Sequence, residues 1–238
     1  MTIPTSWCSN GKLRAAINLG NPVLAQRAAA SGELTGVSVV LARQLAHQIG
    51  CVLELLPYGA ASEVVEANRI DAWDVAFLAI DRQRATQIAF TEPYLAIEGV
   101  LVVAKEASWQ SIDDIDRSGV RIAVGQGAAY DLHLSRVLKH AELVRLPTSS
   151  QVFPYLLAHK LEAGAGIRQP ALGFTQLHPE LRVIEKPFME IRQAMALPLK
   201  NTTSLAYLED FLLDAKQSGL IASALVASGQ AEQVTLIA

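Results

Sequence analysis

Short apolar runs alternate with amphipathic helical patterns along most of the chain, and this alternation is the feature that most limits the fold. A helix is predicted over 37–50, where apolar residues recur every three or four positions and Gly50 ends the pattern. Short apolar strands are predicted around it, at 13–18, 52–56 and 75–79. Strands joined in succession by helices favour a parallel sheet that is covered on both faces. The first third of the chain therefore predicts a β-α-β-α-β unit.

The same alternation returns in the middle of the chain. Strands are predicted at 121–124, 142–146 and 163–167, and helices at 129–138, 151–159 and from Pro170 onward. The helix over 129–138 is expected to face its sheet with Leu132, Val137 and Leu138. Late strands at 181–184 and 193–197, then a helical tail to about residue 228, complete the predicted order.

Two extended apolar segments, 99–105 and 193–200, link these β/α units. They predict a double crossover, with lobe 1 formed by residues 1–101 plus 197–238 and lobe 2 by residues 102–196. The fold class is therefore α/β, with two Rossmann-like β/α lobes joined by a two-strand hinge. Open α/β sheets bind ligands beyond the carboxyl ends of their strands, so we expect a ligand cleft between the lobes that closes by hinge motion.

Composition excludes several classes of protein. Hydrophobic residues make up 51% of the chain and charged residues 18%, which indicates a folded chain. The net charge of −3 comes without a Lys/Arg cluster, so a nucleic-acid partner is not expected. No apolar run approaches the roughly 18 residues of a membrane span, and the N-terminal sequence lacks the pattern of a secretory signal. We expect a soluble protein, either cytoplasmic or exported with its signal removed.

The residues that usually carry covalent or metal chemistry are sparse. Cys8 and Cys51 belong to no CxxC pair and are expected to be free thiols, with a disulfide between them left open. The five histidines show no metal-ligand spacing, so neither a metal site nor a cofactor is predicted. The chain also has no P-loop lysine and no GxSxG nucleophile elbow.

Arg84 is the first candidate for ligand binding. It follows the strand predicted at 75–79, in AFLAIDRQR, and so stands near a carboxyl end. A guanidinium there can bind a carboxylate through two parallel, charge-assisted hydrogen bonds. Arg82, two residues earlier, is interpreted as a solvated loop residue.

The turn Gly125-Gln126-Gly127-Ala128-Ala129 joins a predicted strand to a predicted helix. Backbone amides at such a turn can hold an anion, although an ordinary βα turn has the same pattern. A dinucleotide site is not supported, because Tyr130 stands where the third glycine of that fingerprint would be. Further candidates near strand ends are the aromatic residues Tyr58, Phe90, Tyr94 and Tyr130 and the acidic residues Glu98 and Asp131.

The segment FLAIDRQRATQIAFTEPY, residues 77–94, resembles the family 3 solute-binding proteins, which are the polar amino-acid receptors of ABC transporters. Their pattern has an Arg and then a (V/I)-(D/A)-F-(S/T)-x-P-Y motif, in register with Arg84 and with Phe90, Thr91, Pro93 and Tyr94. GELTGVSVVLARQLAHQIG and GVRIAVGQGAAYD resemble other segments of the family. The likeness spans about Leu13 to Leu225 and implies the type II periplasmic-binding fold.

Departures from the family pattern bear on the ligand. By resemblance, Arg84 holds the ligand carboxylate, but the family's Ser/Thr five residues earlier is Ala79. The family's Asp for the ligand ammonium is replaced by Arg168, and its helix Asp near the cleft by Ser38. An ammonium facing Arg168 would be repelled, so we predict a dicarboxylate, a keto acid or an N-blocked amino acid as ligand.

The predicted ligand-binding set joins both lines of reasoning. It comprises Asn21, Ser38, Tyr58, Phe77, Ala79, Arg84, Tyr94, Glu98, Gln126, Gly127, Ala128, Ala129, Tyr130 and Arg168. The resemblance implies a periplasmic binding protein, monomeric or weakly dimeric, that passes its ligand to an ABC-transporter permease. Two alternatives stay open. One is an enzyme like cyclohexadienyl dehydratase, with Glu98 or Asp131 as acid, and the other is a cytoplasmic ligand-sensing module of the same fold.

Overall fold

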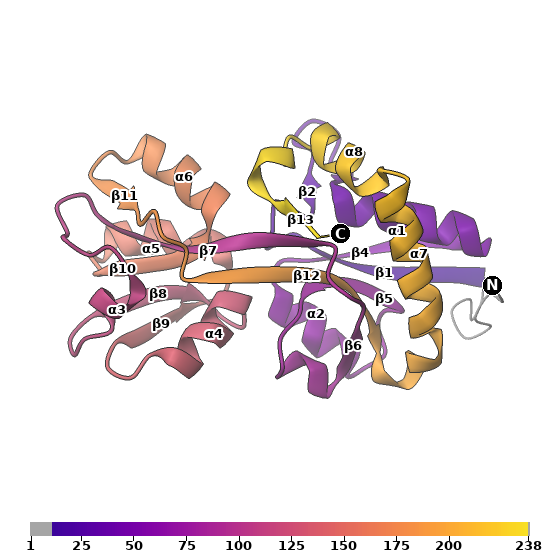
Figure 1. The fold of residues 1–238 in the computed structure, drawn as a ribbon, viewed down its shortest axis with the longest axis horizontal. Coiled ribbons are helices and arrows are strands. Elements are labelled where there is room, and N and C mark those ends of the chain that lie inside the picture. Colours follow the sequence, from indigo (N-terminus) through magenta and orange to yellow (C-terminus); the bar gives the residue numbers. More distant parts are fainter. Residues whose placement is uncertain (1–10, 238) are drawn as a thin grey trace. The chain divides into compact units, whose positions relative to one another are not determined.

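The computed structural model describes residues 11–237. The chain divides into unit 1, Met1–Ala96 with Arg192–Ala238, and unit 2, Ile97–Ile191, which are described separately. It passes from one unit to the other within two strands, β7 (Leu95–Ala104) and β12 (Met189–Pro198) (Figure 1). The lobe boundaries predicted at 101/102 and 196/197 fall in these same strands and stay predictions.

The sheet of unit 1 has the strand order β4-β1-β5-β12. β1 (Lys12–Asn18) pairs in parallel with β4 (Val52–Tyr58) and β5 (Val75–Ala79), and the unit 1 part of β12 runs antiparallel to β5. Some short strands were not predicted, because a strand of two or three residues shows no periodicity in the sequence. They are the β2–β3 hairpin (Gln26–Arg27, Leu34–Thr35), β6 (Ile88–Phe90), which pairs with β12, and β13 (Thr235–Leu236), which pairs with β7.

In the described part of unit 1, the α-helices are α1 (Val37–Ile49), α2 (Ala61–Asn68), α7 (Leu205–Gln217) and α8 (Leu220–Ala227). The crossovers β1-α1-β4 and β4-α2-β5 run in opposite directions along the sheet, so right-handed connections put α1 and α2 on opposite faces (Figure 1). Gly36 precedes α1 at a φ of 108°, where a Cβ would lie 2.5 Å from the Leu24 carbonyl oxygen. α1 ends at Gly50 in the left-handed conformation, as the sequence predicted.

Unit 2 has the strand order β7-β10-β8-β9, with β11 (Leu181–Val183) also paired to β7. β10 (Ala163–Ile167), β8 (Arg121–Gly125) and β9 (Glu142–Leu146) run parallel, and β7 is antiparallel to β10. The helices are α3 (Ile112–Ile115), α4 (Ala129–Val137), α5 (Val152–Ala158) and α6 (Arg168–Leu177). The strands and helices predicted for this region are confirmed, and α3 was not predicted.

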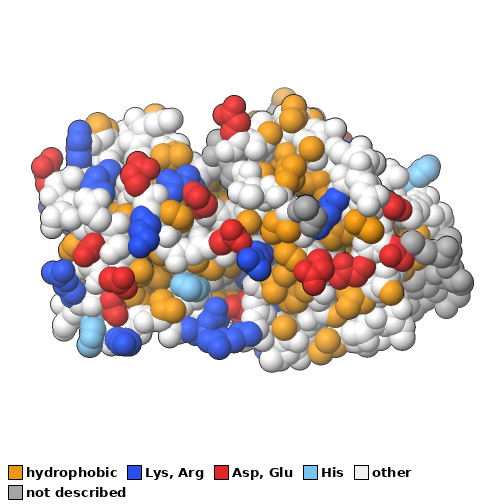
Figure 2. All heavy atoms as spheres, in the orientation of Figure 1, with side chains coloured by type: hydrophobic (Ala, Val, Ile, Leu, Met, Phe, Trp, Pro, Cys, Tyr) orange, Lys and Arg blue, Asp and Glu red, His pale blue; other side chains and the backbone are white. Residues whose placement is uncertain are grey.

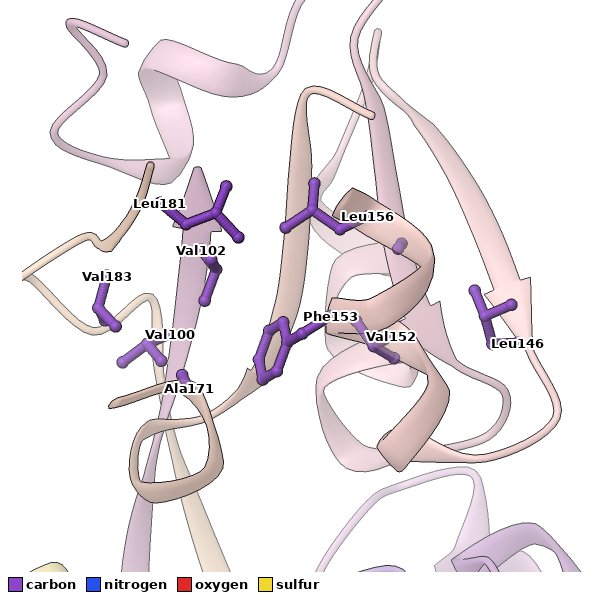
Figure 3. Close-up of a cluster of buried hydrophobic side chains, with 10 residues drawn as sticks. Val100, Val102, Leu146, Val152, Phe153, Leu156, Ala171, Leu181 and Val183 are labelled. Carbon is purple, nitrogen blue, oxygen red and sulfur yellow. The ribbon is translucent and has the colours of Figure 1, made fainter. Parts of the chain in front are cut away.

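The core of unit 2 explains the small residues of β10. Phe153 of α5 packs among apolar side chains from β7, β9, α6 and β11 (Figure 3). A Cβ at Gly166 would lie 2.6 Å from the Phe153 ring, and one at Gly164 would lie 3.3 Å from it. The strand sequence AGAGI therefore leaves room for an aromatic ring on its face.

Two sequence-based predictions are wrong in detail. Helix α4 buries Tyr130, Asp131 and Leu134, while Val137 is 43% exposed, because the short helix turns its last residues away from the sheet. Cys51 is disulfide-bonded and so is not the free thiol that was expected. Cys8 lies outside the described residues.

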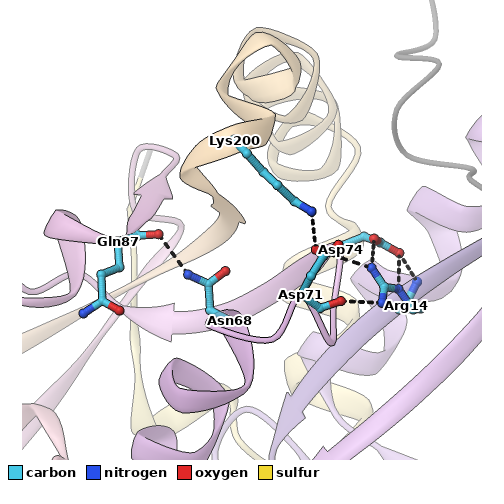
Figure 4. A network of polar contacts seen from close by, with 6 residues as sticks. All are labelled: Arg14, Asn68, Asp71, Asp74, Gln87 and Lys200. Atoms are coloured by element: carbon cyan, nitrogen blue, oxygen red, sulfur yellow. Dashed lines mark hydrogen bonds and ion pairs between the residues drawn. The ribbon is translucent and has the colours of Figure 1, made fainter.

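An arginine–carboxylate clamp braces the first strand of unit 1 (Figure 4). The Arg14 guanidinium donates to both carboxylate oxygens of Asp74, at 3.1 and 2.7 Å, and the Arg14 amide donates to the same group at 2.8 Å. Nη1 of Arg14 donates to the Asp71 carbonyl oxygen at 2.6 Å. Lys200 forms an ion pair with the Asp71 carboxylate at 2.5 Å and so ties the residues after β12 to this clamp.

Unit 2 contains an equivalent clamp. Arg121, the first residue of β8, donates to Glu162 from its amide at 2.8 Å and from two guanidinium nitrogens at 2.9 Å each. Its Nη2 also donates to the carbonyl oxygen of Lys160, which, like Asp71, is a non-glycine residue at positive φ. In both units the carboxylate residue comes just before a strand of the sheet, Asp74 before β5 and Glu162 before β10. A residue in the left-handed conformation supplies the carbonyl oxygen in each case. Each clamp therefore holds its sheet at the amino ends of the parallel strands.

We expect Asp74→Asn to lower the free energy of unfolding by about 1–3 kcal/mol, because it removes a charged acceptor of three hydrogen bonds from a nearly buried site. The control is Glu54→Gln, which removes an ion pair with Lys12 in which both side chains are exposed. This substitution should lower the free energy of unfolding by less than about 1 kcal/mol. Urea unfolding of both variants makes the comparison. Equal losses in the two variants would contradict the clamp.

Candidate functional site

The parallel strands of unit 1 end at one edge of its sheet, and buried polar residues gather there. Asn18 and Tyr58 are paired at the ends of β1 and β4, and Ala79 ends β5 opposite Gln193 of β12. The buried polar residues at or just beyond these strand ends are Asn18, Asn21, Asp81, Arg84 and Gln193. Such an edge is where open α/β sheets bind ligands.

Arg84 lies in a 3-10 turn directly after β5, with only 3% of its surface exposed. Its Nη1 donates to the Ala79 carbonyl oxygen at 2.9 Å, so the strand end holds the guanidinium in place. Burial lowers the pKa of Arg84 to about 10, with the negative charge of Asp81 acting in the opposite sense. The side chain therefore keeps its positive charge at neutral pH.

Asp81 is a residue that the sequence reasoning missed. It is buried two positions after the end of β5, and its Oδ1 accepts a hydrogen bond from the Gln83 amide at 2.8 Å. The edge of unit 1 thus holds a carboxylate beside the Arg84 guanidinium. The sequence signal that could have identified Asp81 is an acidic residue placed just after a buried strand, where α/β sheets bind their ligands.

Other predicted residues of unit 1 have structural environments. Oδ1 of Asn21 accepts a hydrogen bond from the Val23 amide at 3.2 Å and so shapes the loop after β1. Tyr58 is half-buried at the end of β4, and desolvation raises the pKa of its hydroxyl. Phe77, Ser38 and Tyr94 are almost completely buried, and burial raises the pKa of Tyr94. Their contact with a ligand stays a prediction.

The motif Phe90–Tyr94 holds β12 in register. The Thr91 amide donates to the Met195 carbonyl oxygen at 3.0 Å, and the Met195 amide donates back to the Thr91 hydroxyl at 3.1 Å. The Tyr94 amide donates to Gln193 at 2.9 Å, and Lys216 of α7 donates to the Pro93 carbonyl oxygen at 3.0 Å. The motif therefore fixes the strand that lies beside Ala79 at the polar edge.

In unit 2, the turn from Gly125 to Ala129 uses three of its amides within the chain. The amide of Gln126 donates to Leu146 O, that of Gly127 to the Asp131 carboxylate at 2.8 Å, and that of Ala128 to Gly125 O. Asp131 is buried and also bonds Nε of Arg145 at 3.0 Å. A ligand carboxylate at the Gly127 amide would have to displace Asp131, and the predicted role of the turn in binding stays a prediction.

Tyr130 belongs to the interior of unit 2. Its hydroxyl donates to Oγ of Ser149 at 2.8 Å, and burial raises its pKa to about 12. A Cβ at Gly125 would lie 2.9 Å from this hydroxyl, so the glycine is needed for the two groups to meet. The predicted contact of Tyr130 with a ligand stays a prediction.

Glu98 and Arg168 meet at the edge where β8 and β10 end. β7 runs antiparallel to β10 with Gly99 opposite Ile167, and this register brings residue 98 beside residue 168. Nε of Arg168 is bonded to Oε2 of Glu98, and its Nη2 donates to the Glu185 carbonyl oxygen at 2.6 Å. Two predicted residues that are 70 positions apart thus form one ion pair.

Residues 13–226 match the bacterial extracellular solute-binding proteins, family 3. The chain belongs to this family. The family 3 protein is 27% identical over 197 residues to the cyclohexadienyl dehydratase of Pseudomonas aeruginosa, with 80% of this chain and 72% of that relative covered. It is 30% identical over 138 residues to the histidine-binding periplasmic protein of Salmonella typhimurium, covering 56% of this chain and about half of that relative, 52%.

The fold of this family 3 protein is that of type II periplasmic amino-acid-binding proteins. A cysteine-binding protein from Campylobacter jejuni superposes with a TM-score of 0.82 at 16% sequence identity, covering 98% of this chain and 97% of that one. The α/β fold class and the family resemblance predicted from the sequence are confirmed.

One face of the family 3 protein carries side chains of both charges (Figure 2). Basic and acidic side chains are interspersed over the face drawn in Figure 2. No helix among residues 11–237 is both long and apolar enough to span a membrane. Within that same range, no group of three or more His, Cys, Asp or Glu side chains is arranged to hold a metal ion.

Thr91→Val should lower the free energy of unfolding by about 1–3 kcal/mol, because the buried Met195 amide loses its acceptor. Thr91→Ser keeps the hydroxyl and serves as the control, and it should retain most of the stability. Thermal and denaturant unfolding measure both. A valine variant as stable as the wild type would show that the motif does not hold β12.

Proposed function

We propose that this chain is the substrate-binding component of an ABC transporter and that it binds a small carboxylate-bearing ligand through Arg84. The observation that carries the proposal is a charged guanidinium, 3% exposed, held by the Ala79 carbonyl oxygen at the polar edge of unit 1. Asp81 already places a negative charge beside the guanidinium within the chain, and a ligand carboxylate would add a second anionic contact through charge-assisted hydrogen bonds.

The energetics are compatible with a transport receptor. Each charge-assisted hydrogen bond contributes about 1.5–3 kcal/mol, and micromolar affinity needs about 8 kcal/mol. A bidentate contact with Arg84 and a few polar contacts at the same edge therefore suffice. The family and its periplasmic histidine-binding relatives support the transport role.

The proposed ligand is a dicarboxylate, a keto acid or an N-blocked amino acid. Arg168 stands at the position of the family's acidic ammonium partner, and Ala79 at that of its Ser/Thr. Calorimetry against ordinary amino acids and against these three classes tests the choice. Micromolar binding of lysine, glutamine or histidine would contradict it.

For whichever panel member binds, Arg84→Ala should weaken binding at least about tenfold, because one charge-assisted hydrogen bond is worth that factor or more. The matched control is Arg82→Ala, since Arg82 is exposed two positions away and should leave affinity unchanged. Thermal unfolding confirms that both variants fold. Unchanged affinity in a folded Arg84→Ala variant would refute the proposed role of Arg84.

We also propose an extracytoplasmic location. Disulfides persist in oxidising compartments, and Cys51 is disulfide-bonded. Curated relatives named as periplasmic proteins agree with this location. Fractionation of the native host, with the periplasmic extract probed by an antibody, tests it, and a purely cytoplasmic signal would contradict it.

A dehydratase activity is the second candidate, because the relative with 27% identity over 80% of this chain is a cyclohexadienyl dehydratase. Elimination of water and carbon dioxide needs a poised acid. Both acids considered from the sequence are engaged: Asp131 with Gly127 and Arg145, and Glu98 with Arg168. We therefore expect no turnover of prephenate or arogenate by the purified protein, and ring aromatisation followed by ultraviolet absorbance is the measurement.

A further inference from the structure

The segment after helix α8 returns to β7, the strand in which the chain first leaves unit 1. Strand β13 pairs antiparallel with the start of β7, and Thr235 lies opposite Ala96 (Figure 1). The amide of Ile237 then donates to the Tyr94 carbonyl oxygen at 3.2 Å. Unit 1 ends at Ala96 in this strand, so β13 covers the last residues of β7 before the boundary.

β13 and β10 lie on the same edge of β7. β10 and β11 both pair with Val102, so they occupy opposite edges of the strand. Ile184, the residue after β11, donates to the Leu101 carbonyl oxygen at 2.8 Å, so this carbonyl faces the β11 edge. Carbonyl groups alternate between the two edges along a strand, and that of Tyr94, seven positions earlier, therefore faces the β10 edge. Its partner Ile237 places β13 on that edge.

The two pairings on this edge leave a short gap. β10 pairs with β7 from Gly99 to Val103, whereas β13 pairs with residues 95 and 96. Ile97 and Glu98 belong to neither register, and the boundary between the units falls at the first of them. These two residues are therefore the part of β7 that can bend without breaking a pair with β10 or β13.

The segment is fixed at both of its ends within unit 1. Gln230 is 4% exposed, and its amide donates to the Leu225 carbonyl oxygen of α8 at 2.8 Å. Since α8 packs against α1 and α7, the helices hold this end. At the other end, Tyr94 accepts from Ile237 and donates its own amide to Gln193 of β12. One row of hydrogen bonds thus joins the segment to both strands that pass between the units.

The β13 pairing is the weaker of the two. β13 has 2 residues and both are exposed, whereas all 5 residues of β10 are buried. Short, exposed backbone pairings open at a small fraction of the free energy of global unfolding, while buried core strands open only near the full value. The pairing of β13 can therefore be released while the rest of the sheet stays intact.

We propose that residues 230–237 form a strap that controls the hinge. While β13 is paired, bending of β7 is confined to residues 97–98, and its release extends the stretch that can bend to residues 95–98. Each added residue contributes backbone freedom, so the released hinge lets the two units sample a wider range of orientations. The inference rests on the proposed function only in that a receptor that closes on its ligand needs a hinge.

Two proline substitutions separate the pairing from the composition of β13. Because the Ile237 amide faces β7, alternation makes the Thr235 amide face β7 too and leaves the Leu236 amide facing away. Thr235→Pro therefore removes a donor of the pairing and should release the strap. Leu236→Pro places the same ring where no pairing amide is lost, and it serves as the matched control.

Hydrogen exchange of the full chain without ligand measures the release. In Thr235→Pro, the amides of residues 95–98 should exchange at least about tenfold faster than in the wild type, while those of residues 99–103 keep their rates because β10 still covers them. Leu236→Pro should match the wild type in both regions. Unchanged exchange at residues 95–98 in folded Thr235→Pro would overturn the proposal.

Distance measurements by electron paramagnetic resonance test the effect on the hinge. Spin labels on Gln44→Cys in α1 and Gln176→Cys in α6, both exposed positions, report the spread of distances between the units. The distribution should broaden in Thr235→Pro and keep its wild-type width in Leu236→Pro. An unchanged width in Thr235→Pro, or equal broadening in both variants, would overturn the proposal.

A second variant keeps the test decisive if Thr235→Pro fails to fold. A chain that ends at Gln230 lacks β13 and should show the same faster exchange and the same broadening. None of these measurements uses a ligand, so two failures can be told apart. A chain that binds no carboxylate probe refutes the proposed function and leaves the strap standing, whereas unchanged exchange and width refute the strap alone.

Discussion

The buried charge of Arg84 is the constraint on which the polar edge of unit 1 depends. A guanidinium removed from water is costly unless hydrogen bonds and an opposite charge replace its hydration. The end of β5 supplies a carbonyl oxygen from Ala79, and the next turn supplies the carboxylate of Asp81. The motif from Phe90 to Tyr94 supports the same edge indirectly, because its hydrogen bonds keep β12 in register beside β5.

The two units solve the same mechanical problem in the same way. Each has a parallel sheet locked at one edge by an arginine that grips a carboxylate and a carbonyl from a left-handed residue. The candidate binding residues lie at the opposite edges of the two sheets. There the units differ: unit 1 presents a buried cation with Asp81, whereas unit 2 presents the ion pair of Glu98 and Arg168.

Most helices and strands could be predicted because their periodicity is strong. α1 shows apolar spacing of three to four and ends at a glycine, and β5 is a short apolar run between polar turns. The exceptions have physical reasons. Strands of two or three residues leave no pattern, and helix α4 is too short for its spacing to show which face is buried. Of the candidate site, Arg84 was found from its place after a strand, and Asp81 was missed although it has the same placement.

The sequence by itself determined the α/β class, the order of most elements and the family, and it predicted Arg84 as a ligand-binding residue, because all of these depend on local patterns along the chain. Only the tertiary structure decided which polar groups are already engaged. From the sequence alone, Arg168 can be described only as a cation, but the strand register pairs it with Glu98, 70 positions away. Likewise, the amide of Gly127 already donates a hydrogen bond to Asp131. Such partners are chosen by packing in three dimensions, and their charges set the chemistry that an edge can offer to a ligand.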